Sequence, residues 1–463
     1  MSKKVVVIYD DTHKPSKEIA SITGGKSFGE TIFKRKSLKE RMFDIFSGFD
    51  SVDRVISCDD EVLKLPLDEP VVLIYSDFGV IDKEQAGEIC LKAGFAHENY
   101  KVTLDGKIVM LIFSDAAAFK SADANDFSGY TEIKTSGFVD LSDVTNFRTF
   151  ITSGFEARFF NSLSGDEYTL VKESDNVKKL YAEYSFYELL PEEMKQWFVR
   201  PFGFEEKAGR ASYKMQRYHM TDLAIRYVHG AIGMEEFRDI LTKLFYFLSI
   251  RKKESISREE YEKEAKRLYL EKVSERIENL KKHEGYGSIA AFIKSGTDYE
   301  NIDEIFEKYE KLYDSIREKS KFQYCRVCGH GDMCFSNILY SRDTSLLLFI
   351  DVKGATKEEE LYMDPFYDIA KLSHSVCGLY DFFNSDLYEI CIDENLRTRV
   401  NVNTDNRAYV EVFKEFLNNA GIDFRLVRLY EASLFLSMLP LHMDRPKKVF
   451  AFILNAIDIL ESL

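Results

Sequence analysis

The segment 330–337, His-Gly-Asp-Met-Cys-Phe-Ser-Asn, constrains this chain more than any other because a second carboxylate, Asp351, follows it at a short distance. Between them lies a run that ends in the apolar residues 346–350, which predicts a turn followed by a buried strand. Such a strand returns the chain so that Asp351 lies beside Asn337. The sequence therefore predicts a fold in which Asp332, Asn337 and Asp351 meet.

These three polar groups have the spacing that phosphoryl transfer from a nucleotide requires. In that chemistry one carboxylate orients the attacking hydroxyl, while an amide and a second carboxylate hold Mg²⁺ on the phosphates. Asp332, Asn337 and Asp351 can fill these roles in that order. A lone His-Gly-Asp triplet is common, and an aspartate after an apolar run is usually a strand-end cap, so the prediction depends on the combination.

The combination resembles the aminoglycoside phosphotransferase and choline kinase superfamily of protein-kinase-like small-molecule kinases. Three motifs carry the resemblance: HGDxxxxN at 330–337, IDxKG at 350–354, and Asp-Pro-Phe-Tyr-Asp-Ile-Ala-Lys-Leu at 364–372. It implies that Asp332 is the catalytic base and that Asn337 and Asp351 bind Mg²⁺. It also implies that His330 and Asp368 brace the catalytic loop. Val-Lys-Gly follows the metal aspartate where protein kinases have Phe-Gly, which favours a small-molecule substrate.

A kinase of this kind needs an amino-terminal lobe with a lysine on a strand and a glutamate on the next helix. Residues 168–172 follow a turn and are rich in β-branched and aromatic side chains, so they predict a strand that carries Lys172. Capping residues precede a predicted helix over 177–190. Glu183 on that helix is the expected ion-pair partner of Lys172, and Glu188 is the alternative.

The loop that would cover the nucleotide phosphates is sparse, because no G-x-G-x-x-G motif precedes Lys172. Gly154, between predicted strands at 147–151 and 156–160, is the candidate, since glycine allows close approach of the backbone to phosphate. Residues 213–218 predict the strand that leads into the adenine-binding hinge. The sparse loop leaves a nucleotide-binding pseudokinase as an alternative to an enzyme.

Residues 1–140 form a different unit in which strands and helices alternate, which predicts an α/β domain with a mainly parallel sheet. The order of elements resembles a pared-down sugar-nucleotide nucleotidyltransferase of the glycosyltransferase-A type, found fused ahead of kinase domains in bacterial surface-polysaccharide loci. The resemblance implies that Asp77 takes the place of the metal-binding aspartate. Asp10 and Asp11 stand where active enzymes have a glycine-rich loop, so a degenerate domain and a bifunctional nucleotidyltransferase-kinase both remain open. The strands are expected at 5–9, 52–57, 70–75 and 107–113, and the helices at 37–46 and 83–93.

The carboxy-terminal part reads as helical. Residues 254–283 have an amphipathic pattern with many charges, typical of a helix with one solvated face, in the region where the superfamily carries insertions that shape the acceptor pocket. Residues 439–448 interrupt the last helices, either as an acceptor site or as a helix-to-helix turn. The acceptor-site candidates in this interruption are His442, Asp444, Arg445 and Lys448.

Length and charge limit the remaining possibilities. The 463 residues exceed the roughly 250–300 at which one core stops growing, so three parts are expected: 1–140, a kinase amino-terminal lobe at 141–219, and a helical lobe at 220–463. A formal charge of −15 argues against a nucleic-acid partner. The seven cysteines show no repeated spacing, and Cys325 and Cys328 lack the second pair that a structural zinc site needs. The sequence shows no secretory signal and no membrane-spanning run, so a cytoplasmic protein without a membrane partner is expected.

The sequence thus predicts an α/β amino-terminal domain followed by an α+β, bilobal, protein-kinase-like domain with a helical carboxy-terminal lobe. The predicted activity is phosphoryl transfer from ATP, or another nucleoside triphosphate, with Mg²⁺, to a hydroxyl of a small metabolite. The resemblance of residues 1–140 implies a sugar or polyol precursor of bacterial surface polysaccharide as that metabolite. The sequence makes no prediction about the oligomeric state.

Overall fold

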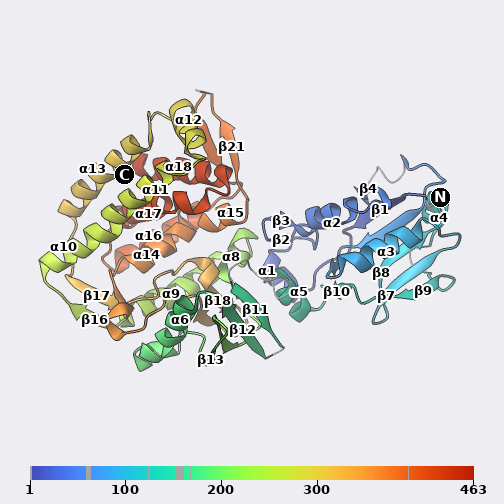
Figure 1. The fold of residues 1–463 in the computed structure, drawn as a ribbon, viewed down its shortest axis with the longest axis horizontal. Helices are drawn as coiled ribbons and strands as arrows, with labels where there is room; N and C mark the ends of the chain where they lie inside the picture. Colours follow the sequence, from blue (N-terminus) through green and yellow to red (C-terminus); the bar gives the residue numbers. More distant parts are fainter. Residues whose placement is uncertain (1–2, 59–63, 124–125, 153–160, 167, 395) are drawn as a thin grey trace. The chain divides into compact units, whose positions relative to one another are not determined.

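The computed structural model describes residues 3–58, 64–123, 126–152, 161–166, 168–394 and 396–463. The chain forms two compact units (Figure 1). Unit 1 comprises residues 1–157 and 225–231, and unit 2 comprises residues 158–224 and 232–463. Residues 141–157 therefore group with unit 1, whereas the domain limits of the sequence analysis, 140 and 219, stay predictions.

Unit 1 is built on a six-stranded sheet with the strand order β4-β1-β5-β8-β7-β9. The strands are β1 (Val5–Asp10), β4 (Val52–Ser57), β5 (Val71–Tyr75), β7 (Tyr100–Leu104), β8 (Lys107–Phe113) and β9 (Thr131–Lys134). The expectation of a mainly parallel sheet is confirmed, since three of its five strand pairs are parallel. Strand β8 is the exception and runs antiparallel to both of its neighbours, β5 and β7. The cause is the two-residue turn between β7 and β8, where Asp105 and Gly106 both have positive φ, as a tight hairpin turn requires.

The helices predicted at 37–46 and 83–93 are confirmed as α2 and α3. Ser37 and Glu40 form a capping box at the start of α2, and the Asp82 side chain caps α3. Both helices contribute to the core on the face of β1 that carries Val5, Val7 and Tyr9. The helices of unit 1 are α1 (Lys17–Thr23), α2 (Leu38–Ser47), α3 (Lys83–Ala93), α4 (Ala116–Ser121) and α5 (Val144–Ile151). Its short strands are β2 (Ile32–Phe33), β3 (Lys36–Ser37), β6 (Phe78–Val80) and β10 (Phe138–Asp140).

Helix α5 replaces the strand predicted at 147–151, so that prediction is wrong. The Asp143 side chain accepts a hydrogen bond from the backbone N–H of Asn146 and starts a helix. Phe147 and Ile151 lie one helical turn apart and are both buried, so the apolar spacing is that of a helix. Gly154 and the strand predicted at 156–160 lie outside the described residues.

The first part of unit 2 is an antiparallel sheet with the order β11-β12-β14-β13, together with α6 (Figure 1). The strand predicted to carry Lys172 and the helix predicted to carry Glu183 are confirmed as β12 and α6. The Asn176 side chain caps α6, and Leu180 packs on Ala211 and Tyr213 of the sheet. The elements are β11 (Asn161–Gly165), β12 (Thr169–Ser174), α6 (Val177–Leu189), α7 (Glu192–Lys195), β13 (Pro201–Lys207) and β14 (Arg210–Gln216).

Unit 2 also contains two small three-stranded sheets. In one of them β18 and β19 form the predicted turn and strand, with Ile338 opposite Phe349. This pairing brings Asn337, which precedes β18, close to Asp351, which follows β19. The sheets contain β15 (Thr221–Asp222), β18 (Ile338–Ser341) and β19 (Leu346–Phe349), and β16 (Lys253–Ser255), β17 (Cys325–Cys328) and β20 (Tyr362–Met363). Cys325 and Cys328 are buried on β17 as free thiols.

The rest of unit 2 is a helical lobe around α17, with α11, α13, α14 and α18 packed against it. The amphipathic segment predicted at 254–283 forms α10 and α11 with a π-helical turn over 267–271, and it buries Tyr261, Tyr269 and Val273. The Tyr269 ring stacks on Tyr430 of α17 with a centroid distance of 3.7 Å. The helices are α8 (Leu223–Val228, divided between the units), α9 (Met234–Ile250), α10 (Arg258–Lys266), α11 (Lys272–Lys281), α12 (Tyr286–Gly296), α13 (Ile302–Lys319), α14 (Tyr367–Val376), α15 (Tyr380–Asn384), α16 (Arg407–Asn419), α17 (Phe424–Met438) and α18 (Pro446–Glu461), with a hairpin of β21 (Glu389–Ile392) and β22 (Thr398–Asn401).

The α+β organisation predicted for the second part of the chain, an antiparallel sheet with one helix followed by a helical lobe, is thus present in unit 2. Within the ranges that the structure describes, no helix is both long and apolar enough to cross a bilayer.

Candidate active site

Asp332 lies in the loop after β17 and is oriented by Asn337 from the short 3₁₀ turn over 335–337. The Asn337 amide Nδ2 donates to the Asp332 carboxylate at 3.0 Å and to its backbone carbonyl at 2.8 Å. The Asn337 side chain is buried, whereas 42% of the Asp332 side chain is exposed. The carboxylate is therefore fixed on one side and open to a substrate on the other.

Lys371, which the sequence analysis did not single out, binds the other oxygen of Asp332 at 2.9 Å. Burial acts to raise the pKa of Asp332, but the Lys371 charge and hydrogen bond, with smaller contributions from His330 and Asn337, bring it below its ordinary value. Burial acts to lower the pKa of Lys371, but the charge of Asp332 outweighs it, so the pKa of Lys371 is raised. Asp332 is thus ionised at neutral pH and can accept a hydrogen bond or a proton.

His330 and Asp368 hold the loop from behind. The Asp332 N–H donates to Nδ1 of His330 at 3.0 Å, and Nε2 of His330 lies 2.9 Å from the Ile350 carbonyl, so both ring nitrogens have hydrogen-bond partners. The Asp368 carboxylate accepts from the N–H groups of His330 at 3.0 Å and Gly331 at 2.8 Å. His330 thereby links the loop of Asp332 to the strand end that precedes Asp351.

Asp368 is itself paired with Arg251, a second residue that the sequence analysis missed. The Arg251 guanidinium lies 3.3 Å from the Asp368 carboxylate and donates to the Pro365 carbonyl at 3.0 Å, and both side chains are buried. Gly329 allows this packing, since a Cβ there would lie 2.7 Å from the Asp368 carboxylate. The buried carboxylate is therefore compensated by one guanidinium and two backbone N–H groups.

Lys172 joins two carboxylates, one from each side of the site. Its ammonium lies 2.6 Å from Glu183 and 2.8 Å from Asp351. Lys172 and Glu183 are buried, whereas 45% of the Asp351 side chain is exposed. Burial acts to lower the pKa of Lys172, but the charges of Asp351 and Glu183 outweigh it and raise the pKa. The ion pair predicted between Lys172 and Glu183 is formed, so the fallback Glu188 is not needed.

The segment around Asp351 is fixed at both ends. The Ile350 N–H donates to the Asn337 carbonyl at 3.0 Å, which holds the start of the segment next to the loop that carries Asp332. The Ala355 N–H donates to the Ala182 carbonyl at 2.9 Å, and the Ser185 hydroxyl donates to the Ala355 carbonyl at 2.6 Å. Helix α6, which carries Glu183, is thereby attached to the segment that carries Asp351.

A divalent cation would find oxygen ligands at Asp351 and Asn337. A half-exposed carboxylate and an adjacent amide are hard donors of the type that Mg²⁺ prefers, together with water and phosphate oxygens. Among the described residues no group of three or more His, Cys, Asp or Glu side chains could hold a metal ion.

The acceptor-site candidates lie near the start of α18, and two of them make contacts to α15 and the residues after it. Arg445 pairs with Asp386, and the buried Lys448 hydrogen-bonds the Asn384 side chain. Asp444 is exposed, and the His442 ring packs edge-on against Phe452 at 5.4 Å. Their role in binding an acceptor stays a prediction.

No protein-family model and no curated protein matches the chain. Three solved structures illustrate what the chain is similar to. A GDP complex of aminoglycoside 2'-phosphotransferase-IIIa is 14% identical and covers 67% of this chain and 90% of its own, with a TM-score of 0.38. Aminoglycoside phosphotransferase APH(3'')-Id from Streptomyces rimosus, in complex with ADP and streptomycin, is 16% identical. The match covers 65% of this chain and 98% of that protein, with a TM-score of 0.34. A thermostable mutant of aminoglycoside phosphotransferase APH(4)-Ia is 11% identical. The match covers 65% of this chain and 95% of that protein, with a TM-score of 0.35.

Proposed function

We propose that the chain is an ATP- and Mg²⁺-dependent phosphotransferase that acts on a hydroxyl of a small metabolite. The observation that carries the proposal is that the ion pairs of Lys172 and the ion pair of Asp332 with Lys371 lie on two segments joined by one hairpin. Lys172 contacts Glu183 and Asp351, and the β18–β19 hairpin joins Asp351 to the loop in which Asp332 is held ionised. Phosphoryl transfer needs a cation for the phosphates, oxygen ligands for a metal and a carboxylate for the hydroxyl, and these residues supply all three.

In the proposed reaction Asp332 accepts the hydrogen bond of the acceptor hydroxyl and takes up its proton. The hydroxyl oxygen forms a bond to the terminal phosphorus of ATP, and the bond from that phosphorus to the bridging oxygen of ADP breaks. Lys172 stabilises charge on the phosphates, and Glu183 keeps the ammonium in place. Mg²⁺ held by Asn337 and Asp351 would neutralise the charge that develops on the transferred group.

The acceptor is proposed to be a sugar or polyol-type precursor of a bacterial surface glycan. The support for this finer proposal is the resemblance of residues 1–140 to sugar-nucleotide nucleotidyltransferases. His442, Asp444, Arg445 and Lys448 are the proposed acceptor-site side chains. A bifunctional nucleotidyltransferase-kinase would in addition release pyrophosphate from a nucleoside triphosphate and a sugar phosphate, which a pyrophosphate assay on the full chain detects.

The test is transfer of labelled phosphate from ATP to a panel of sugars, polyols and amino alcohols by the full-length protein with Mg²⁺. The wild type is expected to label a panel member, and Asp332→Asn is expected to reduce the rate by a factor of 100 to 10,000, the range typical of a general base. Asp343→Asn, at an exposed aspartate in the β18–β19 turn, is the matched control. Equal rates for wild type and Asp332→Asn would refute the role of Asp332. Binding of MgATP without transfer to any acceptor would support the pseudokinase instead.

A further inference from the structure

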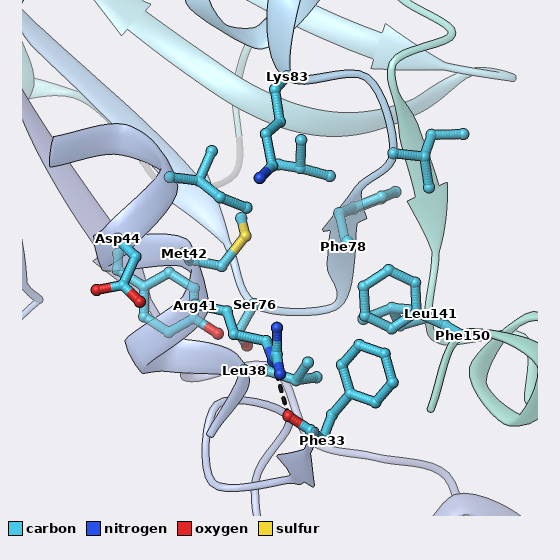
Figure 2. Close-up of a pocket in the computed structure, with 15 residues that line it drawn as sticks. Phe33, Leu38, Arg41, Met42, Asp44, Ser76, Phe78, Lys83, Leu141 and Phe150 are labelled. Atoms are coloured by element: carbon cyan, nitrogen blue, oxygen red, sulfur yellow. Dashed lines mark hydrogen bonds between the residues drawn. The ribbon is translucent and has the colours of Figure 1, made fainter. Parts of the chain in front are cut away.

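Unit 1 contains a cavity of about 210 Å³ at the carboxyl ends of β1 and β5 (Figure 2). Tyr9 of β1 and Ser76, directly after β5, form its inner end, and its walls come from β2, α2, β6, α5 and the residue after β10. In α/β sheets, ligands bind outside the carboxyl ends of parallel strands. None of the lining residues takes part in the site built around Asp332.

The inner end of the cavity carries two buried hydroxyl groups that interact with each other, those of Tyr9 and Ser76. Tyr9 is 2% exposed and Ser76 is 1% exposed. Neither Tyr9 Oη nor Ser76 Oγ forms a hydrogen bond with any other described residue. Because a pair of hydroxyls can form more hydrogen bonds than the one between them, the pair retains a donor and acceptor capacity for a bound molecule. The carboxylates of Asp10, Asp11 and Asp77 act electrostatically on Tyr9, so the group bound there should be neutral.

One side of the cavity is an aromatic wall. Figure 2 shows Phe33, Phe78 and Phe150 along this side and Met42 opposite. The rings of Phe33 and Phe150 have a centroid distance of 5.3 Å at an angle of 37°. Gly79 makes room for Phe150, because a Cβ at this position would lie 2.7 Å from the ring. A flat ring fits between such a wall and a thioether.

The rim of the cavity is positively charged. Lys83, the exposed first residue of α3, has no ion pair with the described residues, and Figure 2 shows its side chain directed over the cavity. Arg41 is held over the Phe33 ring at 4.7 Å and donates to the Phe33 carbonyl at 2.7 Å. The Asp44 carboxylate is neutralised by Lys36 at 2.5 Å. The exposed Lys83 ammonium at the rim therefore attracts an anionic group.

The size and polarity of the cavity select against larger and more hydroxylated molecules. Its volume is below the range of about 300–1,000 Å³ that is common for drug-sized ligands, which favours a single ring. A buried sugar would need a hydrogen-bond partner for each of its hydroxyls. Two hydroxyls and a largely apolar wall meet that need poorly, whereas they suit a ring with one polar substituent.

We propose that this cavity binds a single-ring aromatic or heteroaromatic small molecule that carries an anionic group. The ring lies between Met42 and the aromatic wall, a neutral polar substituent contacts Tyr9 and Ser76, and the anion faces Lys83. This binding site is independent of the phosphotransferase proposal, because it uses residues of unit 1 alone.

The test uses 4-hydroxyphenyl phosphate as the probe and calorimetry on the full-length protein. Lys83→Ala and Tyr9→Phe are each expected to weaken binding about tenfold, the change that loss of one charged or buried hydrogen bond gives. Lys92→Ala, at an exposed lysine near the other end of α3, is the matched control and should leave binding unchanged. Phenyl phosphate, which lacks the inner hydroxyl, should bind more weakly to the wild type and equally to Tyr9→Phe. No heat of binding at millimolar probe, or binding that neither variant weakens, overturns the proposal.

A second measurement separates a binding role of the Tyr9 hydroxyl from a structural one. Because the Tyr9 hydroxyl interacts in the fold with the Ser76 hydroxyl alone among the described residues, Tyr9→Phe should change the thermal unfolding midpoint little. Thermal unfolding of both proteins without a probe measures this. A midpoint lowered by several degrees would show that the hydroxyl serves the fold, and that result contradicts the proposal.

Discussion

Replacing Lys371 by glutamine should shift the pH dependence of phosphoryl transfer towards higher pH. The ammonium lies 2.9 Å from the Asp332 carboxylate and is the largest of the influences that lower the pKa of this group against its burial. An opposite charge at such a distance lowers a carboxyl pKa by about 1–3 units. Because 42% of the Asp332 side chain is exposed and solvent screens the pair, we use the lower limit, about one unit or 1.4 kcal/mol.

The sign of the shift follows from the proposed role of Asp332 as a base, which needs the ionised form of the carboxyl group. In the wild type the pKa of Asp332 lies below its ordinary value, so activity is retained until the pH falls below that depressed pKa. Without Lys371 the pKa rises, and the acid limb of kcat/KM should move up by about one pH unit, while the rate at alkaline pH falls less.

The assay is the initial rate of transfer, to an acceptor or to water, measured across the acid range. Lys371→Arg should retain the wild-type limb because it keeps the charge. Lys357→Gln, which removes an exposed lysine, is the control for net charge. An acid limb of Lys371→Gln that coincides with that of the wild type, in a protein that unfolds normally, would refute the reasoning.

Three further perturbations test other contacts. Arg251→Met should lower the free energy of unfolding by about 3–5 kcal/mol in urea titrations, because it leaves the Asp368 carboxylate buried without its guanidinium; a loss below 1 kcal/mol would contradict this. Lys172→Met should weaken MgATP binding at least tenfold in calorimetry, since the ammonium is the buried cation of the site, whereas Lys178→Met on the exposed start of α6 should bind as the wild type. Asp351→Asn should remove most of the Mg²⁺ dependence of nucleotide binding, and an unchanged dependence would argue against Asp351 as a metal ligand.

Local signals in the sequence were sufficient for the elements that carry the site. Lys172 follows a turn on a strand of β-branched residues, and Glu183 follows a capping residue by two helical turns, so both elements could be predicted from neighbouring residues. The spacing from Asn337 to Asp351 similarly predicted a hairpin, which β18 and β19 form. In each case the physical determinant lies within about fifteen residues of the side chain concerned.

Contacts between distant residues gave no such signal. Arg251 precedes its partner Asp368 by 117 residues, and nothing near Arg251 indicates that it will be buried. Lys371 could have been predicted from the sequence, because Asp368 and Lys371 are one helical turn apart and therefore share a face of α14. At Phe147 and Ile151 the aromatic and β-branched composition favoured a strand, but the Asp143 cap and the four-residue spacing determined a helix.

Two hydrogen bonds attach helix α6 to the segment that follows Asp351. The Ala355 N–H donates to the Ala182 carbonyl, and the Ser185 hydroxyl donates to the Ala355 carbonyl. Many protein kinases are silenced by an outward swing of the helix that carries the glutamate, which separates it from the lysine. Here such a swing would break the two bonds that tie Ala182 and Ser185 to Ala355, as well as the contact of Lys172 with Glu183. For the proposed phosphotransferase we therefore expect α6 to stay in place, so that the rate of transfer follows the supply of substrates.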